Sequence, residues 1–254
     1  MRQLLVKRIS LIILCFFSMF LSAACEYDFD NISNEKNEKI HEDIPADHIK
    51  NVNISGNARS IIIKQGVTNN FEFYNADLDE NNQYEVEATY DEDGNDLNIL
   101  VTMDNAEASN DVLGSVVVSI PNNEFEKIEI TGEFNQVYLC TLNSDVFVCT
   151  NSARVVMNLL ADQLNHNITL VGSESKSFGG VLVYFDTLPE NVRVEFSDTP
   201  QSAINAPFEL PAGDKFELGL GKPIISINNA DKLDFYVEAV DYTGGRKDGP
   251  LSIM

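Results

Sequence analysis

Apolar residues recur every nine positions through the middle of the chain. Written in nines, residues 127–162 read KIEITGEFN, QVYLCTLNS, DVFVCTNSA and RVVMNLLAD. Apolar and polar residues alternate within each unit, which is typical of a short strand with one buried face. The rest of each unit is a turn rich in Asn, Ser and Thr. The residues expected inside are the second and fourth of each unit: Ile128, Ile130, Val137, Leu139, Val146, Val148, Val155 and Met157.

The same alternation occurs before and after this region. Val52 and Ile61 are nine apart, and Phe71 follows ten residues after Ile61. Further on the units lengthen, so that Val181 and Val192 are eleven apart. The 3.6-residue spacing of an amphipathic helix is scarcely present, since the segment NLLADQL is too short to count. The pattern therefore predicts an all-β protein.

A hairpin is predicted near residues 84–102. Two alternating segments, QYEVEATY and DLNILVTM, flank the dipeptide Asp93-Gly94, and Asp-Gly between alternating strands is a strong hairpin signal. The acidic turn lacks the D-x-D-x-D-G and distal Glu spacing of a calcium loop, so we do not expect calcium there.

Short strands at constant spacing fit two architectures. One is a meander folded as a sandwich or barrel. The other is a β-solenoid, in which two nine-residue units make one coil and each coil stacks on the last. The G-G-x-G-x-D repeat of calcium-binding rolls is absent, so such coils would be held together by apolar stacking alone.

Several segments resemble the bacterial "putative adhesin" family whose core is called the head GIN domain. They are KNVNISGNARSIIIKQG, GNDLNILV, GSVVVSIPNNEFEKIEITGEFNQVYL and LGLGKPIISINNADKLDFYV. The resemblance covers residues 49–240 and implies a right-handed parallel β-solenoid-like body of short repeating strands. That family has no established catalytic residues, and the glycine-containing turns common in its coils are few here.

The N-terminus has the features of an export signal. MRQLLVKR is basic, an apolar run follows, and SAAC supplies small residues at a cleavage site, as in secretory signal peptides. A transmembrane anchor is the alternative, but the run from Ile9 to Ala24 is interrupted by serines and is short for a bilayer-spanning helix. We therefore expect residues 1–24 to be a signal peptide.

Cys25 is the expected lipidation site. LSAAC resembles the lipobox of bacterial lipoproteins, in which the Cys after the cut is acylated, although Leu21 lies four places before Cys25 where the family prefers three. Ordinary signal peptidase would also accept Ser22 and Ala24. The polar, unperiodic residues 25–48 favour a flexible tether between lipid and domain. The domain would then span 49–240 and a short tail 241–254.

Charge and composition narrow the partners. The formal net charge is −23, from 17 basic and 40 acidic residues, and loss of residues 1–24 would make it −26. Nucleic acid is not an expected partner because binding it needs a basic surface, and an anionic membrane surface is disfavoured for the same reason. The membrane would be reached through lipid on Cys25.

Catalytic and metal-binding patterns are not found in the sequence. His41 and His48 lie in the predicted tether, and a hydrolase triad would depend almost entirely on His166. The outward positions of residues 127–162 contain a single carboxylate, Glu129, so they do not supply the acid–base pair of a polysaccharide-acting enzyme. We expect no enzyme activity, no metal and no cofactor.

The same outward positions predict a contact surface. Tyr138, Phe147 and Val156 would form an apolar patch, which another strand or the C-terminal segment covers unless it binds a partner. Cys140 and Cys149 lie opposite each other if the chain makes a tight hairpin between them, and on different sheets if it turns a solenoid corner. The repeat and the resemblance favour the corner, and so two thiols rather than a disulfide.

The sequence leaves three functions to consider. The first is an exported, lipid-anchored envelope protein with a non-catalytic, adhesin-like domain that binds a surface protein or glycan. The second is an accessory, protein-binding subunit of an envelope stress or secretion system. The third, a polysaccharide-acting enzyme on a β-helix, is disfavoured by the missing acid–base pair. The protein would lie in the cell membrane or outer membrane, facing the periplasm or the exterior.

Overall fold

The fold is all-β, as predicted. The computed structural model describes residues 38–76, 84–103, 115–151, 154–172, 177–206, 215–237, 240–241 and 245–246. Within these ranges the chain forms strands and one short 3-10 turn, η2 (Gln201–Ala203). The predicted signal peptide and Cys25 lie outside the described residues.

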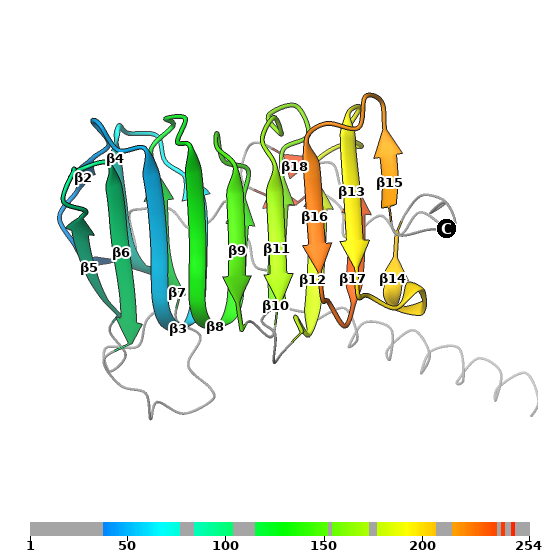
Figure 1. The fold of residues 1–254 in the computed structure, drawn as a ribbon, viewed down its shortest axis with the longest axis horizontal. Helices are drawn as coiled ribbons and strands as arrows, with labels where there is room; N and C mark the ends of the chain where they lie inside the picture. The colour runs from blue at the N-terminus through cyan, green and yellow to red at the C-terminus, as the bar shows by residue number, and fades with distance from the viewer. Residues whose placement is uncertain are drawn as a thin grey trace, which may run out of the picture.

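The strands build two sheets that face each other along an elongated body (Figure 1). In spatial order, the first sheet contains β5 (Tyr84–Tyr90), β6 (Asp96–Met103), the first part of β3 (Asn51–Gln65), the first part of β8 (Lys127–Cys140), β9 (Val146–Thr150), β11 (Ile168–Gly172), β16 (Ile224–Asn228), β13 (Val192–Ser197) and β15 (Lys215–Leu218). The second contains β4 (Asn70–Ala76), β7 (Ser115–Ile120), the later parts of β3 and β8, β10 (Arg154–Leu159), β12 (Gly180–Phe185), β17 (Leu233–Val237) and β14 (Ile204–Asn205).

One coil of the body has one strand in each sheet, and neighbouring coils pair in parallel. Ile128 is aligned with Val146 in the first sheet, and Val137 with Val155 in the second. Both pairs are 18 residues apart, so two nine-residue units make one coil. This is the solenoid arrangement rather than a meander. The later coils are longer, since Val155 is aligned with Val181.

The coils do not follow one another in chain order. The coil made by β3 lies between the β6–β7 coil and the β8 coil, and it pairs in parallel with both. The coil made by β16 and β17 lies between the β11–β12 coil and the β13–β14 coil. At each end of the body, therefore, a segment distant in sequence is inserted as the second coil.

Antiparallel strands close the two ends. β5 and β6 form the predicted hairpin, with Tyr84 aligned with Met103 and Tyr90 with Leu97. Gly94 has a φ of 70° in its turn. β4 runs antiparallel to β7, and β15 antiparallel to β13.

Residues 38–48, which their composition places in the tether, instead belong to the body. β1 (Glu38–Lys39) and β2 (Ile44–Pro45) both pair antiparallel with β4. Ile44 and Ala46 are buried in the main core. These few apolar side chains give the segment enough buried surface to join the sheet, despite its charged residues. Across the boundary between the predicted domain and the predicted tail, β18 (Val240–Asp241) and β19 (Gly245–Arg246) form a two-residue antiparallel ladder.

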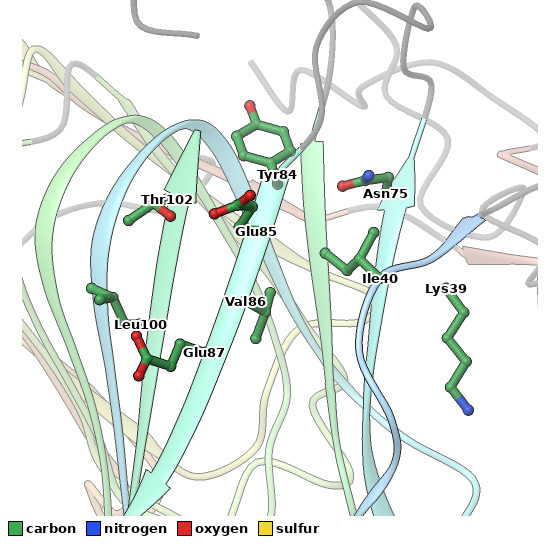
Figure 2. A pocket seen from close by; sticks show the side chains of 9 residues that line it. All are labelled: Lys39, Ile40, Asn75, Tyr84, Glu85, Val86, Glu87, Leu100 and Thr102. Atoms are coloured by element: carbon green, nitrogen blue, oxygen red, sulfur yellow. The ribbon is translucent and has the colours of Figure 1, made fainter. Parts of the chain in front are cut away.

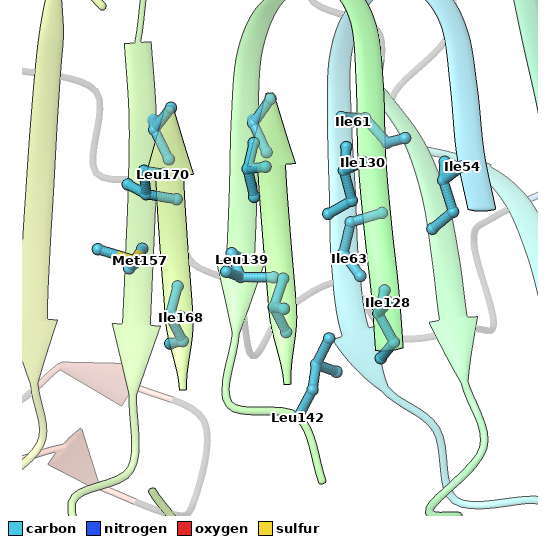
Figure 3. Packing of buried hydrophobic residues seen from close by; sticks show 14 of the residues in the cluster. Ile54, Ile61, Ile63, Ile128, Ile130, Leu139, Leu142, Met157, Ile168 and Leu170 are labelled. Carbon is cyan, nitrogen blue, oxygen red and sulfur yellow. The ribbon is translucent and has the colours of Figure 1, made fainter. Parts of the chain in front are cut away.

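The core fills the space between the sheets. Figure 3 shows isoleucine, leucine and methionine side chains from successive coils stacked between the two layers. Val137, Leu139 and Val148 have no exposed surface and Val146 is 4% exposed, which confirms the inward assignment. β3 and β8 pass from one sheet to the other as continuous strands, and each bends at a glycine with positive φ: Gly56 (136°) and Gly132 (128°).

Candidate functional site

The three predicted contact residues do not form one patch. Tyr138 on β8 and Val156 on β10 are aligned neighbours on the outer face of the second sheet. Phe147 lies on β9 in the first sheet, where the Lys127 ammonium sits 4.8 Å from its ring centroid. Consecutive nine-residue units alternate between sheets, so outward positions nine residues apart lie on opposite faces of the body.

Tyr138 and Val156 belong to an apolar row that crosses the second sheet. Aligned residues from β4, β7, β3, β8 and β10 make up this row: Tyr74, Val117, Ile62, Tyr138 and Val156. All five are buried, and Ile62 and Val117 have no exposed surface. The row is therefore covered, so these residues do not form an open contact surface.

A polar row runs beside it. Glu72, Ser119 and Lys64 are aligned across β4, β7 and β3, and further along Asn158 is aligned with Cys140. Burial lowers the pKa of Lys64, while the nearby Cys140 and Glu72 oppose that shift. Burial also raises the pKa of Tyr74 to about 12, and Glu72 adds to this effect by its charge and a hydrogen bond.

Cys140 and Cys149 lie on different sheets, as predicted for a solenoid corner. Cys140 ends β8 in the second sheet, and Cys149 is in β9 in the first. Neither forms a disulfide.

A pocket opens at the end of the body where the first sheet finishes at β5 and the second at β4 and β1 (Figure 2). Its volume is about 470 Å³, within the range of roughly 300–1,000 Å³ usual for small-molecule sites. Polar side chains dominate the lining. The lining residues are Lys39, Ile40, Asn75, Tyr84, Glu85, Val86, Glu87, Leu100 and Thr102.

Asn75 is the unusual member of this lining. Its side chain is 4% exposed, and neither its amide nitrogen nor its amide oxygen has a hydrogen-bond partner. A buried polar group left unpaired costs about 1–3 kcal/mol, and such groups are rare in native proteins. Asn75 is thus a candidate for a group that a ligand satisfies.

The repeat pattern did not predict this site, although the sequence contains a signal for Asn75. Phe71 and Phe73 point into the core, and Asn75 continues the same face two residues on. A polar residue in an inward series indicates either a buried hydrogen bond or a binding site. The partners of Asn75 in the pocket, from β1, β5 and β6, could not be assigned without the coil order.

Two of the described histidines make separate contacts. His41 contacts the edge of Phe73, and His166 lies near Asp145, with 3.7 Å between Nδ1 and Oδ1. In the described part of the chain, no three His, Cys, Asp or Glu side chains come together as a group that could hold a metal ion. Over the same residues, no helix is long and apolar enough to cross a membrane.

Comparison with known proteins gives a likeness of fold. No family model matches the chain, and no curated protein sequence matches it. The solved structure of a "putative cell adhesion protein" from Clostridium sporogenes is similar, with a TM-score of 0.50 and 14% sequence identity. The match covers 80% of this chain and 99% of that one. At this identity the likeness shows the fold alone.

Proposed function

We propose that the protein is an exported, lipid-anchored envelope protein whose solenoid body binds a surface ligand without transforming it. The observation that carries the proposal is the fold. An elongated body of stacked coils shares its architecture with a protein of proposed cell-adhesion function. Stacked-coil bodies present extended surfaces for binding.

The anchoring part of the proposal depends on Cys25. The basic and apolar segments before it and the sequence LSAAC are features of an exported lipoprotein. Two or more acyl chains hold a protein on a membrane stably, where one chain does not. The polar residues that follow Cys25 would give the body reach from the bilayer.

The non-catalytic part depends on the arrangement of ionisable groups. Glu72 is the carboxylate of the polar row on the second sheet, and its row neighbours Ser119 and Lys64 provide no second carboxylate. Glycoside hydrolysis generally needs two carboxylates that flank one bond. The end pocket has two carboxylates, Glu85 and Glu87, but they lie two residues apart on the same face of β5, so they approach a ligand from one side rather than flanking a bond. Binding through hydrogen bonds needs no such pair, and the pocket offers several donors and acceptors.

Anchoring can be tested with labelled palmitate in bacteria expressing the full chain or Cys25→Ser. We expect label in the membrane-bound wild type and none in the variant, whose product would remain uncleaved or become soluble. Equal labelling of the two forms would contradict lipidation at this residue.

Adhesion can be tested with the same cells on surfaces coated with envelope polysaccharide or envelope protein. Wild-type cells should be retained on at least one coating more strongly than cells carrying Val146→Asp, in which the body is unfolded. Release of new reducing ends from the polysaccharide would instead indicate an enzyme. Equal retention of both strains on every coating would contradict the adhesion proposal.

A further inference from the structure

The pocket at the β5 end of the body lies between the last strands of the two sheets. Asn75 approaches it from β4, while Tyr84 and Val86 approach from β5, which pairs with β6. In Figure 2 the Asn75 amide points from its strand toward the side on which Tyr84 lies. Ile40, which follows β1, lies beside it.

From these groups we infer that the end pocket is a binding site for a neutral sugar, recognised through a pair of adjacent hydroxyls by Asn75. The inference rests on the proposed adhesin-like function and names its ligand. Because the Asn75 amide has an unpaired donor and an unpaired acceptor, it matches a partner that offers both. One hydroxyl of such a pair accepts from the amide nitrogen while its neighbour donates to the amide oxygen. The terminal torsion of Asn is broad, so the enclosed amide can turn toward a ligand within its rotamer.

The other lining groups suit the rest of a sugar ring. Glu85 and Glu87 are exposed carboxylates on the outer face of the β5–β6 hairpin, opposite the inward Val86, and Glu85 is aligned with Thr102. They can accept hydrogen bonds from hydroxyls of a sugar that extends over the edge strand β5. Thr102 contributes a hydroxyl that both donates and accepts. Apolar side chains for the C–H face of the ring come from Ile40 and Val86.

Charge disfavours acidic sugars and phosphate. Among the described lining residues, two are carboxylates and one is a lysine, Lys39, which is held by Asp43 with 2.7 Å between Nζ and Oδ1. An anionic ligand would meet repulsion from Glu85 and Glu87, and of these described residues only the already paired Lys39 could offset it. Neutral pyranosides therefore fit better than uronic acids.

Isothermal titration of the purified protein tests the inference. The probes are methyl glucoside, methyl galactoside, methyl mannoside and N-acetylglucosamine, with galacturonic acid and inorganic phosphate as anionic counterparts. At least one neutral probe should bind saturably and more tightly than either anion. Absence of binding by all four neutral probes, or equal binding by an anion, would overturn the inference.

Two variants locate the site. Asn75→Leu should weaken binding of the neutral probe by about tenfold or more, and should raise Tm because it removes an unpaired buried amide. Asn165→Leu, in the exposed loop between β10 and β11, is the matched control. It should leave the affinity for the neutral probe unchanged. Unchanged affinity in Asn75→Leu would assign Asn75 to structure alone and refute the proposed contact.

The cell-retention assay separates this inference from the proposed function. If cells carrying Asn75→Leu are retained as strongly as wild-type cells, the adhesion proposal is supported, and the end pocket is refuted as the site of adhesion. If the purified protein binds a sugar but no cells are retained on any coating, the sugar site is supported and the adhesion proposal is refuted. Binding of an extended peptide along β5, with no neutral sugar bound, would also refute the sugar site.

Discussion

Gly132 lies directly against Gly56 where β8 and β3 bend from the first sheet to the second. A Cβ built on Gly132 would lie 2.2 Å from the Gly56 carbonyl oxygen, and the φ of Gly132 is 128°. Gly56 is enclosed in turn, since its own Cβ would lie 1.8 Å from the Val101 carbonyl oxygen. Three backbones therefore meet at this corner at a separation that only glycine permits.

Gly132→Ala should therefore destabilise the protein strongly. The backbone conformation alone costs about 1–3 kcal/mol for a residue with a side chain, and the contact with Gly56 adds to that. Gly180→Ala is the control, because Gly180 lies in β12 with no atom within 4 Å of an added Cβ. Urea unfolding should separate the two variants, and equal unfolding midpoints would show that the corner tolerates a side chain.

Val146→Asp should unfold the body. Val146 is 4% exposed, in the main core, and burying an unpaired carboxylate costs about 3 kcal/mol or more. Glu129→Lys is the outward control, since Glu129 is partly exposed on β8 and forms a surface ion pair with Lys127. Losing that pair should cost less than about 1 kcal/mol. Circular dichroism during thermal unfolding measures both, and similar losses would contradict the inward and outward assignment.

The nine-residue repeat predicted the coils well because it reports burial directly. Val137 and Val146 are inward in successive half-coils, and each is aligned with a valine or isoleucine 18 residues away. Periodicity also placed Cys140 and Cys149 on different sheets. It failed for the contact patch because Tyr138 and Phe147, which are nine residues apart, lie in opposite sheets. In these coils the side-by-side neighbour of Tyr138 is Val156, 18 residues away.

The order of the coils could not be predicted from periodicity. Ile54 is aligned with Ile130 and also with Ile99, and any of the strands rich in Ile and Val could have occupied these positions. The choice depends on which strands the connecting segments bring together at the ends of the body. The end pocket depends on that choice, so its residues from β1, β4, β5 and β6 were not grouped in advance.

The phenol of Tyr74 should lose its proton at a higher pH than an exposed tyrosine. Its pKa is raised to about 12, first by burial and then by Glu72, with a smaller contribution from Asp43. Since the folded pKa exceeds the unfolded value of about 10, the stabilisation linked to this group is full below pH 10. It is lost as the pH rises toward 12.

Ultraviolet difference titration of wild type against Tyr74→Phe isolates this phenol from the other tyrosines. Glu72→Gln should lower the Tyr74 pKa only in part, because burial is the larger cause. A Tyr74 signal with a midpoint near pH 10 would contradict burial of the phenol.

Removal of the inserted β16–β17 coil should release the final coil. β13 pairs with β16 and β15, and β14 pairs with β17, so in the described structure these partners hold the β13–β14 coil to the body. A chain that ends after residue 206 lacks all three of them. Residues 192–205 should then exchange amide hydrogens at nearly unprotected rates, while β8, β9 and β10 keep their protection.

A chain that ends after residue 246 keeps every described strand and is the control for this truncation. Its hydrogen exchange, followed by mass spectrometry, should match that of the full chain throughout the body. Protection of residues 192–205 in the shorter chain would mean that β13 and β14 dock directly on β11 and β12. In that case the β16–β17 coil would not be needed to hold the β13–β14 coil on the body.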